Sequence, residues 1–575
     1  MKTRIFRAPA ARYYAEDILE GPDVYDDGGL ADLARDGFNG IWLRARLRDA
    51  CRTAVFPELG ADAGRQQERL NQLGERARRH DVRVWLYLNE PLCFPADHPF
   101  WKRHPAVKGV PGSSGMDDWP RTFALCTSHP DVQAFLRDGV KELFRACPTL
   151  GGVFTITRSE HHTHCWSHVA GEKPSGCPRC DARDPAEVIA EVTNLIAEGM
   201  HAVAPDAQVI AWNWAWDDWQ TRIIDRLDRR VIVMADFESG GRKVIAGKER
   251  CINEYSRSYI GPSEQFLTAH RQARARGQVV FAKLQIGTTH ELATVNNLPL
   301  IPNLLGKARA LRRLDVDGAL CCWNFGNRLT LNTWAFHRFV TDERLDGKSD
   351  DEALGAVARE YLGVTDAEPV LAAWRWFVKA FDHYPFHRHF LYSSPVNYAV
   401  VYPLPRPGDA DRPMPWTWIP LQKPYGTRLR ETADHPWGQT GFTLEEYRDA
   451  FAAMTEDFAV GLEAYARALA GNTRPAAMRE LRNARVIAHV LRSASNIYAT
   501  YLLAQAEPFD EPAWCEIAAD EAAHLEDLAS WLRGETEIGF HSEASAWFFT
   551  EPEVREKIAA LRHHLRHAPA KENVS

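Results

Sequence analysis

The sequence predicts an α/β protein, a TIM (β/α)8 barrel followed by a C-terminal, mostly helical domain. Strand-like runs alternate with helical stretches over roughly the first 330 residues, which indicates a parallel sheet. Eight strand–helix units fit into about 320 residues, the number that a barrel requires. The rest of the chain has an aromatic, Pro-rich segment and then helical periodicity. We therefore expect a catalytic barrel in 1–340, an extension of helix and aromatic loop in 341–440, and a helical domain in 441–575.

The expected strands are short runs rich in β-branched and aromatic residues, bounded by turn residues. A helix over 29–35, closed by Asp36-Gly37, precedes the first strand. In chain order, we expect the strands at 38–44, 82–88, 122–125, 153–157, 208–212, 231–235, 279–284 and 318–323. The carboxyl ends of parallel barrel strands surround one site, so the residues at these ends are the candidates for function.

The fourth expected strand leads into the stretch around which the chain is organised, Gly151–Cys180. Val153–Thr157 is a β-branched run opened by two glycines, which is typical of a buried strand. Glu160 follows it and is itself followed by a loop rich in His and Cys. Parallel α/β folds place catalytic groups at the carboxyl ends of strands. We therefore predict that Glu160 is the working acid, the alternative being a surface glutamate near a helix N-terminus.

Polar and aromatic side chains at the strand ends are suited to binding a sugar. Arg, Lys and Asn donate hydrogen bonds to hydroxyls, carboxylates accept them, and Trp rings pack on apolar sugar faces. The chain has 19 Trp. Because strand side chains alternate, we expect about half of these residues to contact ligand. The predicted substrate-binding residues are Arg44, Asn89, His161, Trp212, Trp214, Trp216, Lys283, Gln285, Glu291, Trp323 and Asn324. Glu90, next to Asn89, also ends a strand, and a loop salt bridge is the alternative role for Glu291.

A strand ending in an acid, Arg44 after the first expected strand, and Trp-rich later strands resemble glycoside hydrolase family 20, the β-N-acetylhexosaminidases. The segment from His290 to Asn327 is also similar to the end of the barrel in family-20-like hydrolases. Glycoside hydrolysis needs an acid at the leaving oxygen and a second group that attacks or stabilises the anomeric carbon. The resemblance implies that Glu160 is the acid and that the substrate's 2-acetamido oxygen attacks, with retention. It implies a terminal β-linked N-acetylhexosamine as substrate, N-acetylgalactosamine among the candidates.

The sequence departs from the family at one position, because Ser159 stands where the family has an Asp before the acid. A hydroxyl can hydrogen-bond but cannot stabilise an oxazolinium cation as a carboxylate does. We therefore expect the polarising group on another strand, with Asp236 and Glu238 as the first candidates. The alternative is a double-displacement glycosidase on another sugar, in which Glu238, Asp236 or Glu291 is the nucleophile. A non-catalytic carbohydrate-binding barrel and a zinc-dependent hydrolase are further alternatives.

Three cysteines after the predicted acid have the spacing of a metal site. Cys165, Cys177 and Cys180 form C-x11-C-x2-C, and thiolates at this spacing fold onto one tetrahedral zinc ion. The fourth ligand is expected to be Cys126, at a neighbouring strand end, or one of His162, His164 and His168. Four protein ligands would make the zinc structural, whereas an open position would activate water. Free thiols are the alternative.

Composition excludes several classes of partner. The formal net charge of −8, without a basic block, gives no nucleic-acid footprint. There is no run of about 18 apolar residues and no signal-peptide core, so we expect a cytoplasmic protein that does not bind membranes. The segment 384–438, with Trp416 and Trp418, is expected to cover a site, contact another copy in a homo-oligomer, or pack on the domain surface. Thr443 and Glu446 form a capping box, which predicts the start of a core helix.

Overall fold

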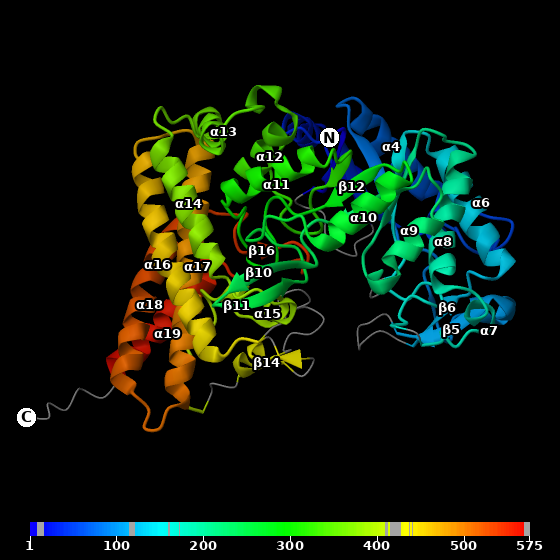
Figure 1. The fold of residues 1–575 in the computed structure, drawn as a ribbon. Helices are drawn as coiled ribbons and strands as arrows, with labels where there is room; N and C mark the ends of the chain where they lie inside the picture. Colours follow the sequence, from blue (N-terminus) through cyan, green and yellow to red (C-terminus); the bar gives the residue numbers. More distant parts are fainter. Residues whose placement is uncertain are drawn as a thin grey trace, which may run out of the picture. The chain divides into compact units, whose positions relative to one another are not determined.

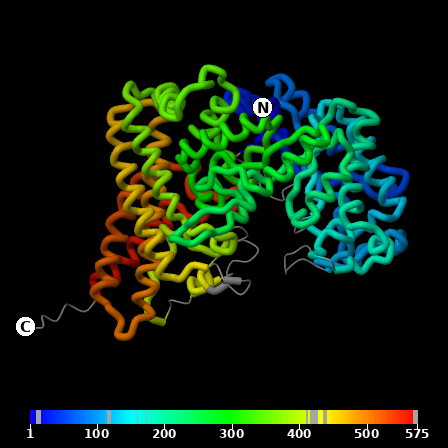
Figure 2. Tube along the Cα trace, in the orientation of Figure 1, coloured from blue at the N-terminus to red at the C-terminus, as the bar shows by residue number. Residues whose placement is uncertain are grey.

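The computed structural model describes residues 1–8, 17–113, 121–158, 161–171, 173–408, 412–414, 427–435, 438–439 and 441–567. The chain forms two compact units, each built from segments that are not consecutive. The first comprises Met1–Phe237, Glu264–Leu284 and Leu311–Trp323, and the second Glu238–Ser263, Gln285–Ala310 and Asn324–Ser575. The chain can be followed through both units by colour in Figures 1 and 2.

The first unit contains a closed barrel, as predicted. Its strand order is β1-β13-β12-β9-β8-β7-β3-β2, every neighbouring pair is parallel, and β1 pairs with both β13 and β2. The strands are β1 (Thr3–Phe6), β2 (Gly40–Ala45), β3 (Arg83–Leu88), β7 (Leu150–Ile156), β8 (Gln208–Trp212), β9 (Ile232–Asp236), β12 (Val280–Lys283) and β13 (Gly318–Leu320). The carboxyl ends of these strands therefore lie at one end of the barrel.

One predicted barrel strand was wrong. Residues 122–125 do form a strand, β6 (Thr122–Leu125), but it is the middle strand of an antiparallel sheet with β4 (Phe94–Pro95) and β5 (Lys108–Gly112). The eighth barrel strand is instead β1, at the start of the chain. Strand β1 is added before β7 and β6 is removed before it, so β7 is still the fourth barrel strand.

Glycine and aromatic residues together determine the packing of the barrel. A Cβ at Gly152 of β7 would lie 2.0 Å from the carbonyl oxygen of Gln208, so only glycine allows β8 to pair this closely. The barrel interior holds aromatic rings from several strands. Trp42 stacks on Trp323 with centroids 4.9 Å apart, and Trp323 also meets Trp212 edge-on at 5.2 Å. Because these residues come from different parts of the cylinder and meet each other, they fill its centre.

The remaining elements of the first unit surround the barrel or connect its strands. Helix α6 packs on α8, and α9 packs on both α8 and α10. The helices are α1 (Asp17–Val24), α2 (Asp27–Arg35), α3 (Leu47–Ala50), α4 (Ala63–Arg78), α5 (Phe100–Arg103), α6 (Pro130–Ala146), α7 (Pro178–Asp181), α8 (Pro185–His201), α9 (Gln220–Arg226) and α10 (Glu264–Ala275). Helix α11 (Ile301–Arg313) runs from the second unit into the first.

The second unit contains the predicted C-terminal helical region. Its elements are the hairpins β10 (Gly241–Ile245)–β11 (Lys248–Ile252), β14 (Asp434–His435)–β15 (Gly438–Gln439) and β16 (Phe540–His541)–β17 (Ala546–Trp547), and helices α12 (Leu331–Thr341), α13 (Asp350–Val357), α14 (Glu368–Asp382), α15 (Arg388–Ser393), α16 (Leu444–Ala468), α17 (Pro475–Gln505), α18 (Glu511–Trp531) and α19 (Glu551–His567). Long helices run side by side in the order α14, α16, α17, α18, α19 (Figure 1). The capping box of Thr443 and Glu446 starts α16, as predicted. Trp416 and Trp418 lie outside the described residues. Among the helices described, none combines the length and the apolar character needed to cross a membrane.

Candidate active site

The predicted acid Glu160 and its neighbour Ser159 lie outside the described residues, but the chain on the preceding side is anchored. Arg158 donates from Nη1 to the carbonyl oxygen of Ala215 at 2.6 Å and from Nη2 to that of Val169. Its guanidinium lies 4.5 Å from the ring centroid of Trp219. The end of β7 is therefore fixed to the loop after β8.

Two of the three clustered histidines after Glu160 have hydrogen-bond partners within the protein. Nδ1 of His162 lies 2.8 Å from Oγ1 of Thr122, and Nε2 of His164 lies 2.7 Å from the carbonyl oxygen of Thr157. Burial lowers the pKa of His162 to about 4 and that of His164 to about 3, so both rings are neutral near pH 7. Neither ring joins the cysteine cluster described below.

His161 has a different environment. It is 1% exposed, and burial together with the charge of Arg44 lowers its pKa well below the ordinary value. Arg44 is half-buried, and its backbone N–H donates to Oδ2 of Asp17 at 2.8 Å. These two predicted substrate residues are therefore close enough to act on each other at the ends of β2 and β7.

A carboxylate and an amine lie at the ends of β9 and β12. Oδ1 of Asp236 accepts a hydrogen bond from Nε1 of Trp212 at 3.0 Å, and its backbone N–H donates to Oδ1 of Asn213. Nζ of Lys283 lies 5.6 Å from the Trp212 ring centroid. Asn89, at the end of β3, donates to the carbonyl oxygen of Ile156, while its Oδ1 is buried without a hydrogen-bond partner in the described chain. The strand ends thus present both donors and acceptors.

Glu90 is a second buried acid at the end of β3. Its carboxylate accepts from the backbone N–H groups of Leu47 at 2.8 Å and Leu92 at 3.2 Å. Burial nevertheless raises its pKa to about 7, with these hydrogen bonds and Arg48 opposing the shift. Because both oxygens already bind the backbone, Glu90 supports the loop after β2.

The predicted tryptophans differ in exposure. Trp212 and Trp216 are each 1% exposed, and Trp323 is 7% exposed. The Trp216 indole N–H donates to Oγ1 of Thr157, so this ring braces the end of β7. Trp214 is partly exposed and lies 5.8 Å from the Trp212 ring. Of these four, Trp214 has the most accessible ring for stacking on a sugar.

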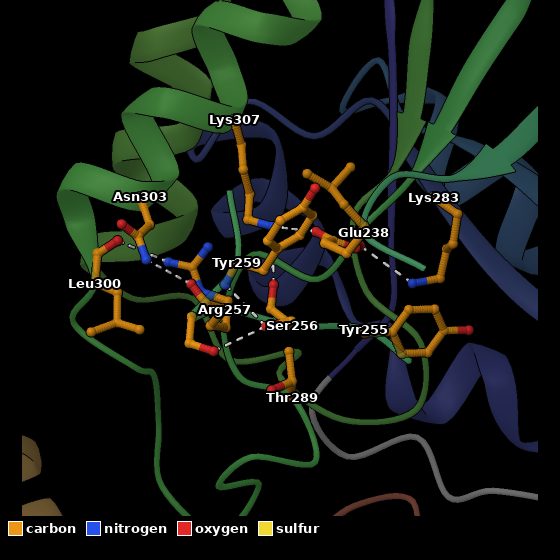
Figure 3. A network of polar contacts seen from close by, with 12 residues as sticks. Glu238, Tyr255, Ser256, Arg257, Tyr259, Lys283, Thr289, Leu300, Asn303 and Lys307 are labelled. Atoms are coloured by element: carbon orange, nitrogen blue, oxygen red, sulfur yellow. Dashed lines mark hydrogen bonds and ion pairs between the residues drawn. The ribbon is translucent and has the colours of Figure 1, made fainter. Parts of the chain in front are cut away.

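Glu238, Glu291, Gln285 and Asn324 belong to the second unit. Glu238 is fully buried and forms an ion pair with Lys307, which also donates to the carbonyl oxygen of Ser256 at 3.0 Å (Figure 3). Burial lowers the pKa of Lys307 to about 8, and the charge of Glu238 opposes that shift. The carboxylate of Glu238 is therefore paired with a buried cation.

Glu291 lies at the centre of the same buried region and is 0% exposed. Its Oε1 accepts from Oγ of Ser256 at 2.9 Å and from the backbone N–H and hydroxyl of Ser258 at 3.2 and 2.5 Å. Its Oε2 accepts from the backbone N–H of Arg257 at 2.6 Å and from Oγ1 of Thr289 at 2.7 Å. Five donors thus occupy this carboxylate, a network typical of a structural residue.

Gln285 and Asn324 differ in how their amides are used. Nε2 of Gln285 donates to the carbonyl oxygen of Phe325 at 3.3 Å. Asn324 is 0% exposed, and neither its Oδ1 nor its Nδ2 has a hydrogen-bond partner in the described chain. A buried amide without partners is a candidate for contact with a bound polar molecule.

The sequence offered no signal for one further polar cluster in the second unit. Nε2 of His290 lies 3.2 Å from Oε2 of Glu543, and the His290 ring packs 4.3 Å from that of Phe325. Beside it, the hydroxyl of Tyr392 donates to Oε2 of Glu254 at 2.6 Å. These residues are up to 289 positions apart, from 254 to 543, so no local motif could have revealed the cluster.

The structure brings together the three cysteines that the spacing suggested and Cys126, one of the four candidates for the fourth ligand. Cys126 directly follows β6, Cys165 lies in the connection between β7 and α7, and Cys177 and Cys180 lie at and within α7. All four are buried and unpaired by disulfides, and their Sγ atoms lie within 4.8 Å of one another. Such a set of sulfurs has the composition of a tetrathiolate metal site.

No protein-family model matches this chain, and no curated protein matches it in sequence. Solved structures do resemble it. A GH138 enzyme targeting pectin rhamnogalacturonan II has a TM-score of 0.56 and 10% identity, over 98% of this chain and 84% of that one. A family 89 glycoside hydrolase from Clostridium perfringens, in complex with PUGNAc, has a TM-score of 0.51 and 11% identity. That match covers 99% of this chain and 64% of that one. At these identities the similarity shows the fold alone: this chain has a fold found in glycoside hydrolases, and the resemblance to family 20 is supported only at that level.

Proposed function

We propose that this protein is a retaining, exo-acting glycoside hydrolase that removes a terminal β-linked N-acetylhexosamine by substrate-assisted catalysis. The observation that carries the proposal is the arrangement of Asp236, Lys283 and Trp212 at the strand ends of the barrel, the same end to which β7 delivers the chain that leads to Glu160. The family 89 enzyme, which shares the fold, has also been solved in complex with 2-acetamido-1,2-dideoxynojirimycin, a compound with the acetamido group that the mechanism requires.

In this mechanism Glu160 donates its proton to the glycosidic oxygen while the acetamido oxygen attacks the anomeric carbon and expels the leaving alcohol. The resulting oxazolinium ion carries a positive charge, which a nearby carboxylate stabilises. Glu160 then removes a proton from water, which opens the ring with net retention. Asp236 is the proposed stabilising carboxylate, because it ends the barrel strand β9 in the same unit as β7, whereas Glu238 belongs to the second unit and Ser159 carries no charge.

The other strand-end groups are proposed to hold the sugar. Asn89 and Lys283 are buried beneath the strand ends and suit the hydroxyls of one terminal residue, whereas Arg44 and Trp214 are partly exposed and suit the rim. We propose that these groups bind the hydroxyls of one terminal sugar, which would favour removal of a terminal residue over cleavage within a polymer.

The double-displacement alternative uses the same residues differently. Here Asp236 attacks the anomeric carbon of a sugar that lacks an acetamido group and forms a covalent intermediate. The GH138 enzyme supports this alternative, because its named target is pectin. Of the earlier nucleophile candidates, Asp236 remains preferred, since it ends a barrel strand, whereas Glu238 and Glu291 belong to the second unit.

Aryl glycosides that differ only in the 2-substituent test the proposal. Nitrophenol release from the 2-acetamido sugar, with none from the 2-hydroxy sugar, is the expected result. Glu160→Gln and Asp236→Asn should each lower kcat by about 10²-fold or more, whereas Asp218→Asn, an exposed acid in the loop after β8, should not change it. Turnover of 2-hydroxy sugars with a trapped 2-fluoro glycosyl adduct on Asp236 would establish the alternative. Sugar binding without any turnover would make the protein a carbohydrate-binding barrel.

A further inference from the structure

The four buried cysteines of the first unit have the dimensions of a filled metal site. A regular tetrahedron with Zn–S bonds of about 2.3 Å has S···S edges of about 3.8 Å. Sγ of Cys126 lies 3.6 Å from that of Cys177 and 3.8 Å from that of Cys180, and all pairs including Cys165 lie within 4.8 Å. We propose that these four thiolates bind one structural zinc ion.

The surroundings favour a metal over bare thiols. A hydroxyl lies against the cluster, because Oγ of Ser128 is 3.4 Å from Sγ of Cys180. Donors directed at sulfur stabilise the charge of thiolates and orient them as ligands. Sulfur-only, tetrahedral donor sets select zinc or iron–sulfur centres, which the test below separates.

The backbone next to the cluster is shaped to admit it. Gly109 of β5 faces Cys165, and a Cβ at position 109 would lie 2.8 Å from Sγ of Cys165 and 2.9 Å from the carbonyl oxygen of Ala124. Any larger residue would push Cys165 out of its place. The small antiparallel sheet therefore provides one wall of the metal site.

The ion would join two connections that are separate in sequence. Cys126 belongs to the connection between β3 and α6, whereas Cys165, Cys177 and Cys180 belong to the connection between β7 and α8. With four protein ligands, no coordination position remains for a catalytic water, so the role is structural. The zinc would fix the long connection between β7 and α8. This inference does not depend on the proposed glycosidase activity.

Metal analysis of the full-length protein, purified under reducing conditions without chelator, tests the proposal. One zinc per chain is expected, and Cys126→Ser, Cys165→Ser, Cys177→Ser and Cys180→Ser should each lose it. The control variants Cys147→Ser, at a buried thiol, and Cys251→Ser, at an exposed one, should retain it. Replacement of zinc by Co²⁺ should give thiolate-to-cobalt charge transfer and the strong visible bands of a tetrahedral site.

Four outcomes would overturn the proposal. In the first, the protein binds neither Zn²⁺ nor Co²⁺ and all four thiols react with a thiol reagent. In the second, the protein mass is lower by four hydrogens, which indicates two disulfides. The third is the absorption spectrum of an iron–sulfur centre, and the fourth is zinc retained in the four serine variants. Zinc content is compared among the variants that are soluble and have native circular dichroism. If no serine variant is soluble, the metal content and the cobalt spectrum of the wild type decide whether the four thiolates bind zinc. Because metal content is measured without substrate, failure of the zinc proposal would be distinct from failure of the proposed enzymatic activity.

Discussion

Replacing Glu291 by glutamine separates a structural role for this residue from a role in binding sugar. In the wild type the carboxylate accepts hydrogen bonds from two backbone N–H groups and three hydroxyls, all inside the second unit. Glutamine keeps one acceptor oxygen but places an NH₂ group on the other side. If that group faces the N–H of Arg257, two donors point at each other.

The cost can be worked out from these contacts. A hydrogen bond to a charged group contributes about 1.5–3 kcal/mol, and leaving a buried donor unsatisfied costs about 1–3 kcal/mol. The guanidinium of Arg257 is also fully buried, and although burial lowers its pKa to about 10, the negative charge of Glu291 opposes the shift. Loss of that charge leaves the cation less compensated. We expect Glu291→Gln to lower the free energy of unfolding by about 3–5 kcal/mol.

The assay compares denaturant unfolding with kcat on the aryl glycoside that the wild type turns over. Glu291→Gln should unfold at lower denaturant, while the folded fraction keeps wild-type kcat within a few-fold. Glu249→Gln is the matched control in the same unit, because its ion pair with Arg242 is on the surface and should contribute less than about 1 kcal/mol. Wild-type stability in Glu291→Gln together with abolished turnover would refute this reasoning and make Glu291 a substrate ligand.

Three further predictions concern the first unit. Gly109→Ala should destabilise the protein by about 1–3 kcal/mol and reduce its zinc content. Gly64→Ala in α4 is the control, because a Cβ there meets nothing within 4 Å, and it should stabilise the protein by up to about 1 kcal/mol. Melting temperatures and metal analysis test both variants. Because burial raises the pKa of Glu90 to about 7, the free energy of unfolding of the wild type should fall by about 3 kcal/mol as pH rises from about 4.5 through 7. Glu90→Gln should not show this fall when the melting temperatures of both proteins are compared at pH 5 and pH 8. Arg158→Met should lower both the melting temperature and kcat, because two carbonyl contacts and the stacking on Trp219 are lost; unchanged kcat would show that the end of β7 does not depend on Arg158.

Much of the fold could be predicted because the spacing of apolar residues along the sequence indicates which residues are buried. The alternation of strands and helices was sufficient for a barrel of eight strands. It could not identify every member, because the pattern of a short strand does not reveal its partners. Thr3–Phe6 is only four residues long and lies in a charged stretch, whereas Thr122–Leu125 has the appearance of a buried strand and belongs to another sheet.

The candidate site shows the same division between local and distant information. Cys177 and Cys180 are only three positions apart, so their convergence could be anticipated. Cys126 was one of four candidates for the fourth ligand, beside His162, His164 and His168, because sequence spacing does not show which distant side chain reaches the cluster. The hydrogen-bond and ion-pair partners of the buried acids, in contrast, are distant in sequence. The sequence near Glu291 does not indicate that residues 256–258 donate hydrogen bonds to its carboxylate. Likewise, Lys307, the ion-pair partner of Glu238, is 69 positions away from it. Burial of Trp212 and Trp216 likewise follows from the closed barrel, since composition alone does not distinguish a core ring from one that stacks on sugar.

The leaving-group dependence of Glu160→Ala tests the central claim most directly. If Glu160 is the acid at the end of β7, turnover of a nitrophenyl substrate should fall by about 10²–10⁴-fold. Cleavage of a dinitrophenyl substrate, whose leaving group needs no protonation, should stay close to wild type in its first step. Added azide should then restore turnover and give a glycosyl azide of retained configuration. Equal loss on both substrates without azide rescue, or no loss on either, would contradict the assignment of Glu160 as the acid.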